Sequence, residues 1–179
     1  MSKLRNALEK FASAKIIIIL LAVMIALNGS MILFTLPTIE ANSGGIKAFD
    51  LNFFGYSYET AAAFLEMLSP ESRGVYLYIQ EPLDFLYPVA TVLFFMLSII
   101  FFRKKKDNLY LIALVPFILD LLENALVITM LIRQKTTVAL TAAASAATVS
   151  KYISVAVVGC FVIILAVKYL VARRKARKI

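Results

Sequence analysis

The sequence predicts an all-α membrane protein: a four-transmembrane-helix bundle with an extracytoplasmic cap of short helices. Hydrophobic residues make up 61% of the 179 residues, well above the roughly 45–50% of soluble domains. Four apolar runs are each about 20 residues long, enough to cross a bilayer. The basic residues gather beside these runs, as topology signals do. We therefore interpret the net charge of +8 as a sign of membrane orientation, with the lipid bilayer as partner and no nucleic acid.

The first predicted helix covers residues 16–36, and we expect Pro37 to end it. A basic stretch precedes this run, as in signal peptides. The apolar run is longer than the 7–15 residues of a signal peptide, so we expect a retained anchor.

Residues 37–82 follow as a predicted outer cap that is acidic and rich in aromatic residues. Ser57 is a candidate N-cap for a short helix. Ser69, with Pro70 and Glu71 behind it, is a second candidate. We expect this cap to be ordered, to lie on the outer membrane surface and to lead into the second spanning helix.

The remaining chain supplies three more spans in one polytopic domain. The second covers residues 83–102, the third residues 108–132 and the fourth residues 152–171. Between the last two lies an Ala- and Thr-rich outer segment, residues 136–150. It either extends the fourth helix or forms a short helical arm.

Three basic clusters predict the orientation. They are Lys3, Arg5, Lys10 and Lys15; Arg103, Lys104, Lys105 and Lys106; and Arg173, Arg174, Lys175, Arg177 and Lys178. In a four-pass chain all three fall on one side. We therefore expect a multi-pass protein of the cell (plasma or inner) membrane with both termini in the cytoplasm.

Residue usage restricts the chemistry. The chain has no His and one Cys, Cys160, so it can form no intramolecular disulfide and no Ser–His or Cys–His catalytic pair. Imidazole and thiolate metal sites are excluded almost entirely. We expect no metal site, no cofactor and no catalytic residue that the sequence identifies.

Polar residues interrupt the third predicted helix. Asp120 lies about 18 Å and Glu123 about 22 Å from its cytoplasmic end at 1.5 Å per residue. Asn124 follows Asp120 at i+4, and Glu123 follows it at i+3, so the three share one face. They fall in the outer half of the bilayer.

The first two helices carry polar residues at similar depth. Tyr87 lies about 22 Å and Asp84 about 27 Å from the cytoplasmic end of the second helix, and Asn28 about 18 Å along the first. Pro88 removes the hydrogen bond to the carbonyl of Asp84, and Pro116 is expected to kink the third helix in the same way. Two kinks in neighbouring helices can open a cavity.

These residues predict a ligand-binding site. An acid inside the membrane costs roughly 2.5–3.5 kcal/mol, whereas interhelical hydrogen bonds contribute only about 0.6 kcal/mol on average. We therefore favour a functional site over structural pairing between helices. Its predicted members are Asp120, Glu123, Asn124, Asp84, Tyr87 and Asn28, with Arg73 and Lys151 as charge partners.

Three functions follow from this site. The first, which we favour, is binding of a small polar or cationic ligand, or a lipid head group, between the second and third helices. The second is a non-catalytic subunit or assembly partner, either as a homo-oligomer or with another membrane protein. The third is an intramembrane enzyme that uses Asp84 and Asp120 as an acid–base pair. We expect a binding protein more than an enzyme.

Three short motifs carry a resemblance. R-G-V-Y at residues 73–76, D-F-L-Y-P at residues 84–88 and D-L-L-E-N at residues 120–124 resemble the pattern of a group of small four-pass membrane proteins that carry no assigned function. The resemblance implies a four-helix fold with this polar face and implies no particular activity.

Overall fold

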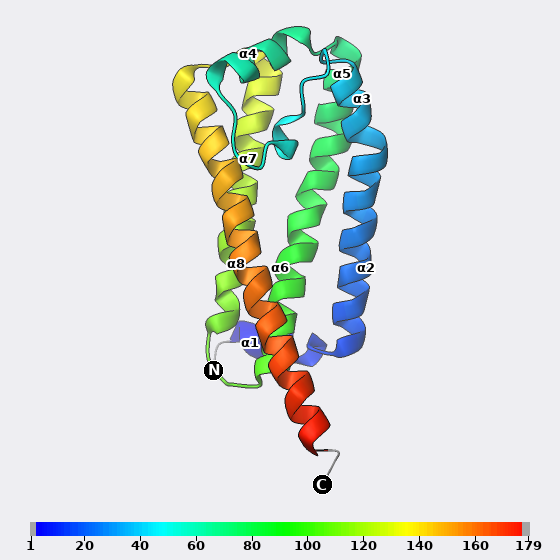
Figure 1. The fold of residues 1–179 in the computed structure, drawn as a ribbon, viewed down its shortest axis with the longest axis vertical. Coiled ribbons are helices and arrows are strands. Elements are labelled where there is room, and N and C mark those ends of the chain that lie inside the picture. Colours follow the sequence, from blue (N-terminus) through cyan, green and yellow to red (C-terminus); the bar gives the residue numbers. More distant parts are fainter. Residues whose placement is uncertain (1–2, 177–179) are drawn as a thin grey trace.

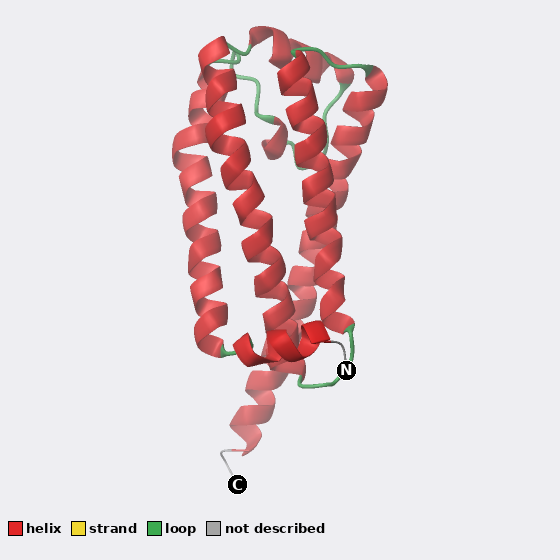
Figure 2. Cartoon of the chain, turned by 180° about the vertical axis from the view of Figure 1, so that it is seen from behind, coloured by secondary structure: helices red, strands yellow, loops and turns green. Residues whose placement is uncertain are grey.

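The computed structural model describes residues 3–176, and every regular element in that range is a helix (Figures 1 and 2). Four helical stretches are long and apolar enough to cross a membrane. They are Ala14–Ala41, Pro70–Arg103, Leu109–Arg133 and Val138–Ala176. The predicted all-α fold with four membrane-spanning helices is confirmed. Arg177 and Lys178 of the third basic cluster lie outside the described residues.

The first span continues through Pro37, so the predicted end at this residue is wrong. After α1 (Lys3–Phe11), α2 (Ala14–Ser30) passes into the π-helical segment η1 (Met31–Thr35) and then into α3 (Leu36–Ala41). A proline ring clashes with the carbonyl four residues earlier in an α-helix. Here Pro37 stands directly after a π-helical turn, which widens the helix and accommodates the ring.

The second span repeats this arrangement. It is one continuous helical stretch made of α5 (Pro70–Val75), η3 (Tyr76–Gln80) and α6 (Glu81–Arg103). Pro82 follows the π-helical segment η3 as Pro37 follows η1. Ser69 caps its start by accepting a hydrogen bond from the Ser72 amide. The span therefore begins well before the predicted residue 83, because the second short helix of the cap runs into it.

The third span, Leu109–Arg133, agrees with the predicted residues 108–132 within one residue at each end, whereas the fourth begins much earlier than predicted. The 3₁₀ segment η4 (Leu109–Ala113) leads into α7 (Leu114–Arg133). Pro116 lies in the first turn of α7, close behind η4, and the kink expected at this residue stays a prediction. The fourth span, α8 (Val138–Ala176), is one helix of 39 residues. It includes most of the Ala- and Thr-rich segment, which extends the helix and forms no separate arm.

The cap helix α4 (Tyr58–Met67) crosses one end of the bundle, which we call the cap end (Figure 1). Ser57 accepts a hydrogen bond from the Thr60 amide, as its predicted N-cap role requires. At the opposite end lie α1 and the connection between α6 and η4 (Figure 2). We call this the basic end.

Residues 42–57, here called the inserted loop, descend from the cap end between the spanning helices (Figure 1). The loop contains η2 (Phe49–Leu51), in which Phe49 and Asp50 are 2% and 7% exposed. Gly55 has a φ of +85°, and a Cβ there would lie 2.5 Å from Ser145 Oγ of α8. The loop thus packs directly on α8. The prediction that the whole cap lies on the membrane surface is wrong for this segment.

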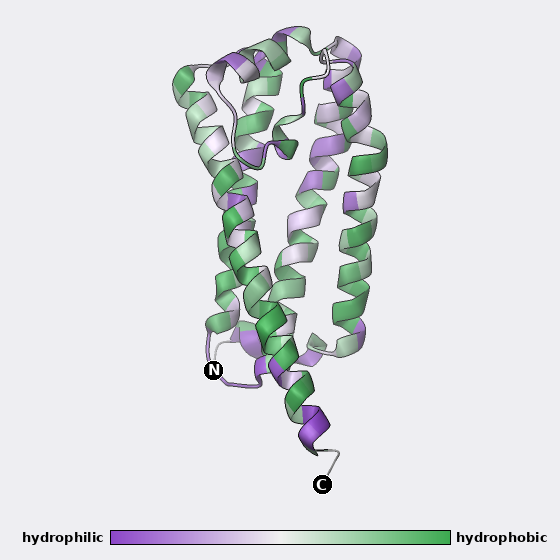
Figure 3. Cartoon of the chain, viewed as in Figure 1, coloured by the Kyte–Doolittle hydropathy of each residue, from purple (hydrophilic) through white to green (hydrophobic). Residues whose placement is uncertain are grey.

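Two hydrophobic clusters divide the interior. One, near the cap end, includes Phe64 and Met130. The other, near the basic end, includes Phe95 and Val158. Hydrophilic residues on α6 and the inserted loop stand out against the mainly hydrophobic helices (Figure 3). Along α7 and α8 the polar side chains lie between the two clusters, and this is where the candidate site forms.

Candidate ligand-binding site

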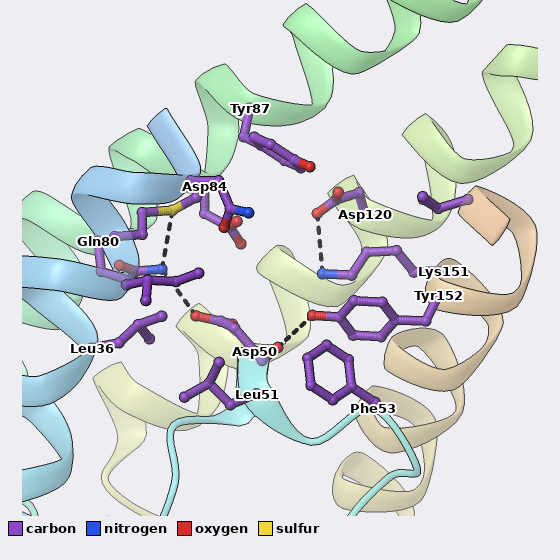
Figure 4. A pocket seen from close by; sticks show the side chains of 14 residues that line it. Leu36, Asp50, Leu51, Phe53, Gln80, Asp84, Tyr87, Asp120, Lys151 and Tyr152 are labelled. Atoms are coloured by element: carbon purple, nitrogen blue, oxygen red, sulfur yellow. Dashed lines mark hydrogen bonds and ion pairs between the residues drawn. The ribbon is translucent and has the colours of Figure 1, made fainter. Parts of the chain in front are cut away.

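A cavity of about 180 Å³ lies between α2, α6, α7, α8 and the inserted loop. Side chains from different helices point toward this common space (Figure 4). The polar residues that line it are Asn28, Asp50, Gln80, Asp84, Tyr87, Asp120, Lys151 and Tyr152. The apolar residues that line it are Met31, Ile32, Leu36, Leu51, Phe53 and Val155.

The structure brings together four of the six predicted site residues. Asn28, Asp84, Tyr87 and Asp120 all line the cavity, and Lys151 lines it with them. The site therefore has walls from all four spans, whereas the prediction placed it between the second and third helices.

Arg73 takes no part in this site. It lies in α5, eleven residues before Asp84 in the same helical stretch, which separates the two by about 16 Å along the helix. Within residues 3–176 it forms no ion pair. Its predicted role as a charge partner is wrong because the second span begins earlier than expected and carries Arg73 toward the cap end.

Lys151 is the cation of the site. It lies inside α8, about 20 Å from the start of this helix, whereas the predicted fourth span began only after it, at residue 152. Its Nζ lies 3.6 Å from Asp120 Oδ1 and contacts Glu123 Oε2. Thr148 donates a hydrogen bond to Glu123 Oε1 at 2.6 Å. Glu123 is fully buried behind the cavity wall, so it fixes Lys151 and does not face a ligand.

Asn124 also lies behind the wall. Its Nδ2 donates a hydrogen bond of 3.2 Å to the backbone carbonyl of Asp84. This is the carbonyl that Pro88 leaves without its helical donor. Asn124 therefore ties α7 to the backbone of α6 and, contrary to its predicted membership of the site, does not line the cavity.

The inserted loop contributes Asp50, which the sequence analysis did not assign to the site. Gln80 donates from Nε2 to Asp50 Oδ2 at 3.2 Å, and Thr35 donates to Gln80 Oε1. These two partners come from the ends of the π-helical segments η3 and η1. Tyr152 donates to the backbone carbonyl of Asp50 at 2.5 Å. Residues of three spans thus hold Asp50 in place beside the cavity, by its carboxyl and by its backbone (Figure 4).

The sequence contained a signal for Asp50. It is preceded by Ala48 and Phe49 and followed by Leu51, and such apolar neighbours are unusual for an acid in a solvated loop. Burial raises the pKa of the Asp50 carboxyl well above its ordinary value, and the nearby carboxyls of Asp84 and Glu123 raise it further.

The buried charges in this region do not balance. Among the described residues, five acids are buried here and Lys151 is the one buried cation beside them. The acids are Asp50, Glu81, Asp84, Asp120 and Glu123.

Two of these acids face the cavity with an unused oxygen. Asp84 Oδ2 and Asp50 Oδ1 are buried and accept no hydrogen bond from the described residues. An ionised carboxylate without a partner is costly in a low-dielectric interior. A bound proton or a bound cation is needed to compensate each one.

Three of the five acids, Asp50, Asp84 and Asp120, line the cavity and come from three different parts of the chain. Within residues 3–176 no group of three or more His, Cys, Asp or Glu side chains is close enough to hold a metal ion. The arrangement suits a ligand that spreads its hydrogen bonds over several walls.

The comparisons with known proteins leave the site to be interpreted from its own chemistry. No family model, curated protein or solved structure matches the chain. The resemblance to the four-pass group carried by residues 73–76, 84–88 and 120–124 stays a prediction.

Proposed function

We propose that this protein binds a small cationic ligand in an acidic cavity inside the membrane. One observation carries the proposal: Asp84 and Asp50 present buried carboxyl oxygens without hydrogen-bond partners to an internal cavity. A cation that donates hydrogen bonds satisfies these acceptors and offsets the excess of buried acids.

The way in which two acids of this region bind Lys151 supports a cation as ligand. Asp120 and Glu123 already hold one ammonium group, that of Lys151. Lys151 also lies over the Tyr152 ring, with Nζ 5.1 Å from the ring centroid. Attraction between a cation and an aromatic face adds to such binding. Tyr87 offers a second ring on the cavity wall.

The size of the cavity limits the ligand. An engineered apolar cavity of about 150 Å³ holds benzene. The cavity here measures about 180 Å³, so the part of the ligand inside it has roughly six to eight non-hydrogen atoms. Short alkylammonium ions fall within this limit.

We further propose that the basic end faces the cytoplasm and that the cavity lies in the outer half of the membrane. Support comes from the basic residues of α1, of residues 103–106 and of the end of α8, because cytoplasmic segments are enriched in Lys and Arg. Along the helices, Asn28 lies about 20 Å from Lys15, and Tyr87 about 24 Å from Arg103. In a hydrocarbon core of about 30 Å both depths fall beyond the midplane.

Reporter fusions test this orientation. A green fluorescent protein fused to the C-terminus should fluoresce, and an alkaline phosphatase inserted after Gly45 should be active. The reverse pattern would contradict the proposed orientation.

Isothermal titration calorimetry of the purified protein in detergent tests the binding function. Ethylammonium chloride should bind to the wild type, whereas ethanol, its neutral counterpart, should not. Asp84→Asn removes one anionic acceptor and should weaken ethylammonium binding by about tenfold or more, which corresponds to one charge-assisted hydrogen bond. Glu71→Gln is the matched control, because Glu71 is an exposed acid of the same span. Equal binding of ethanol, or unchanged affinity in Asp84→Asn, would overturn the proposal.

A further inference from the structure

The cavity has an apolar side that reaches the surface of the bundle. Ile32 lines the cavity and is 51% exposed. It belongs to η1 inside the first span, so its exposed side faces lipid once the span is in a bilayer. Phe53 of the inserted loop also lines the cavity and is 52% exposed. The cavity is therefore bounded on this side by residues that meet the membrane.

The helix arrangement explains this opening. The helix α2 packs on α6, and α8 packs on α7 and α6. In the view of Figure 1, α2 and α8 stand on either side of α6. Leu36 and Met31 line the cavity from the first span, and Val155 lines it from α8. Apolar side chains thus flank the cavity where the first and fourth spans face each other.

We propose that the ligand is a membrane-embedded amphiphile with a protonated primary amine as its head group, which enters the cavity sideways between α2 and α8. The proposal rests on the cation-binding function and names the class of cation. The head group lies among Asp50, Asp84 and Tyr87. The hydrocarbon chain leaves past Ile32 into the surrounding lipid.

The free acceptors select the head group. A primary ammonium has three N–H donors, as a lysine side chain does. Asp84 Oδ2 and Asp50 Oδ1 are two buried acceptors on the cavity wall that take no hydrogen bond from the described residues, and these donors can satisfy them. A trimethylammonium group carries the same charge and has no donor. It would leave both oxygens unsatisfied and would also be bulkier in a cavity of about 180 Å³.

The apolar rim selects the chain. A short amine makes little apolar contact with the lipid-facing side of the cavity, because water and the polar walls solvate it. An alkyl chain attached to the amine stays in the bilayer while the head group turns inward past Ile32. Bulk added at Ile32 should therefore hinder a long-chain amine more strongly than a short one.

Calorimetry on the full-length protein in lipid nanodiscs tests this with three probes: ethylammonium, dodecylammonium and dodecyltrimethylammonium. Titrations into protein-free nanodiscs are subtracted to remove heats of partitioning. Dodecylammonium should bind the wild type, and dodecyltrimethylammonium should bind about tenfold more weakly or not at all, as loss of a charge-assisted hydrogen bond implies. Equal affinity of the two long-chain probes would overturn the assignment of a primary amine without any variant.

The lateral route is tested with Ile32→Trp and a matched control, Ile25→Trp. Ile25 is 65% exposed on α2 and does not line the cavity. Ile32→Trp should weaken dodecylammonium binding several-fold more than ethylammonium binding, whereas Ile25→Trp should change neither affinity. If Ile32→Trp weakens both amines alike, or neither, entry from the membrane is wrong. If ethylammonium fails to bind even the wild type, the proposed cation-binding function itself fails.

Discussion

Two groups of buried charge in this molecule are built in opposite ways. At the basic end, Arg5 is 3% exposed. Its Nε donates to Glu9 at 2.8 Å, and its terminal nitrogens donate to the backbone carbonyls of Lys105 and Asp107. In the acidic cavity, by contrast, Lys151 stands beside five buried acids, and carboxyl oxygens of Asp84 and Asp50 have no partner among the described residues.

The pKa values of two loop acids, one in each group, are shifted in opposite directions. At the basic end, the hydrogen bonds that Arg103 donates to Asp107, at 2.6 and 2.9 Å, lower the pKa of that carboxyl. In the inserted loop, burial raises the pKa of Asp50. The basic-end charges are matched by the protein itself and stabilise the fold. The acids at the cavity are only partly paired with a cation of the protein. Such unpaired buried carboxyls require a bound proton or a bound cationic ligand to offset their cost.

The largest expected effect on stability comes from replacing Lys151, the lysine that pairs with Asp120 and Glu123. Lys151→Met leaves Glu123 and Asp120 without their cation. Removal of one partner of a buried ion pair should lower the free energy of unfolding by about 3–5 kcal/mol. Reversible unfolding with sodium dodecyl sulfate in mixed micelles measures it.

Two variants sharpen this result. Lys168→Met, an exposed lysine of the same helix, should leave stability nearly unchanged. Adding Glu123→Gln to Lys151→Met should recover part of the loss. A Lys151→Met protein as stable as the wild type would mean that Glu123 and Lys151 are not a matched pair.

A smaller loss of stability is expected at the basic end. Arg5→Gln removes charge-assisted hydrogen bonds to two carbonyls and to Glu9, and should cost about 2 kcal/mol. Lys10→Gln on the exposed side of α1 is the control. Neither variant should change the affinity for ethylammonium, because α1 lies at the opposite end from the cap. Loss of affinity in Arg5→Gln would break the separation between the two groups of charge.

The smallest effect is a dependence of stability on pH. Because the folded-state pKa of Asp50 is raised, the folded protein binds a proton more tightly than the unfolded chain. The stability from this proton is fully present below the unfolded pKa and is lost as the pH rises toward the folded pKa. As the pH rises above about 4, the ordinary range of an Asp carboxyl, the wild type should therefore lose stability relative to Asp50→Asn. Parallel stability curves, or a gain by the wild type, would show that Asp50 does not hold this proton.

Much of the fold could be predicted because bilayer thickness sets the length of an apolar helix. The helix ends could not be predicted equally well. Pro37 normally indicates a helix end, but η1 in front of it lets the helix continue to Ala41. Single π-helical turns are rare and leave no simple sequence pattern. The inserted loop was misplaced for another reason: its descent into the bundle depends on contacts with α8 from distant parts of the chain, such as Gly55 on Ser145.

Part of the site could be predicted because helical spacing fixes the depth of a residue along a spanning helix. Helical spacing placed Asp120 and Asp84 in the same half of the membrane, and both line the cavity. Spacing on one helix could not tell that Asn124 bonds to a backbone carbonyl or that Glu123 points behind the wall. Asp50 was out of reach of such reasoning, because no helix period links it to the spans.

One measurement tests the central claim most directly: the shift in unfolding temperature that saturating ethylammonium causes in wild type, Arg5→Gln and Asp84→Asn. A ligand that binds only the folded state raises this temperature. Arg5→Gln should unfold at a lower temperature than the wild type and keep the full shift. Asp84→Asn should unfold at the wild-type temperature or above, because it loses an unmatched acid, and should lose most of the shift. If Asp84→Asn keeps the shift, or if both variants lose it together with their stability, the unmatched acids are not a binding site.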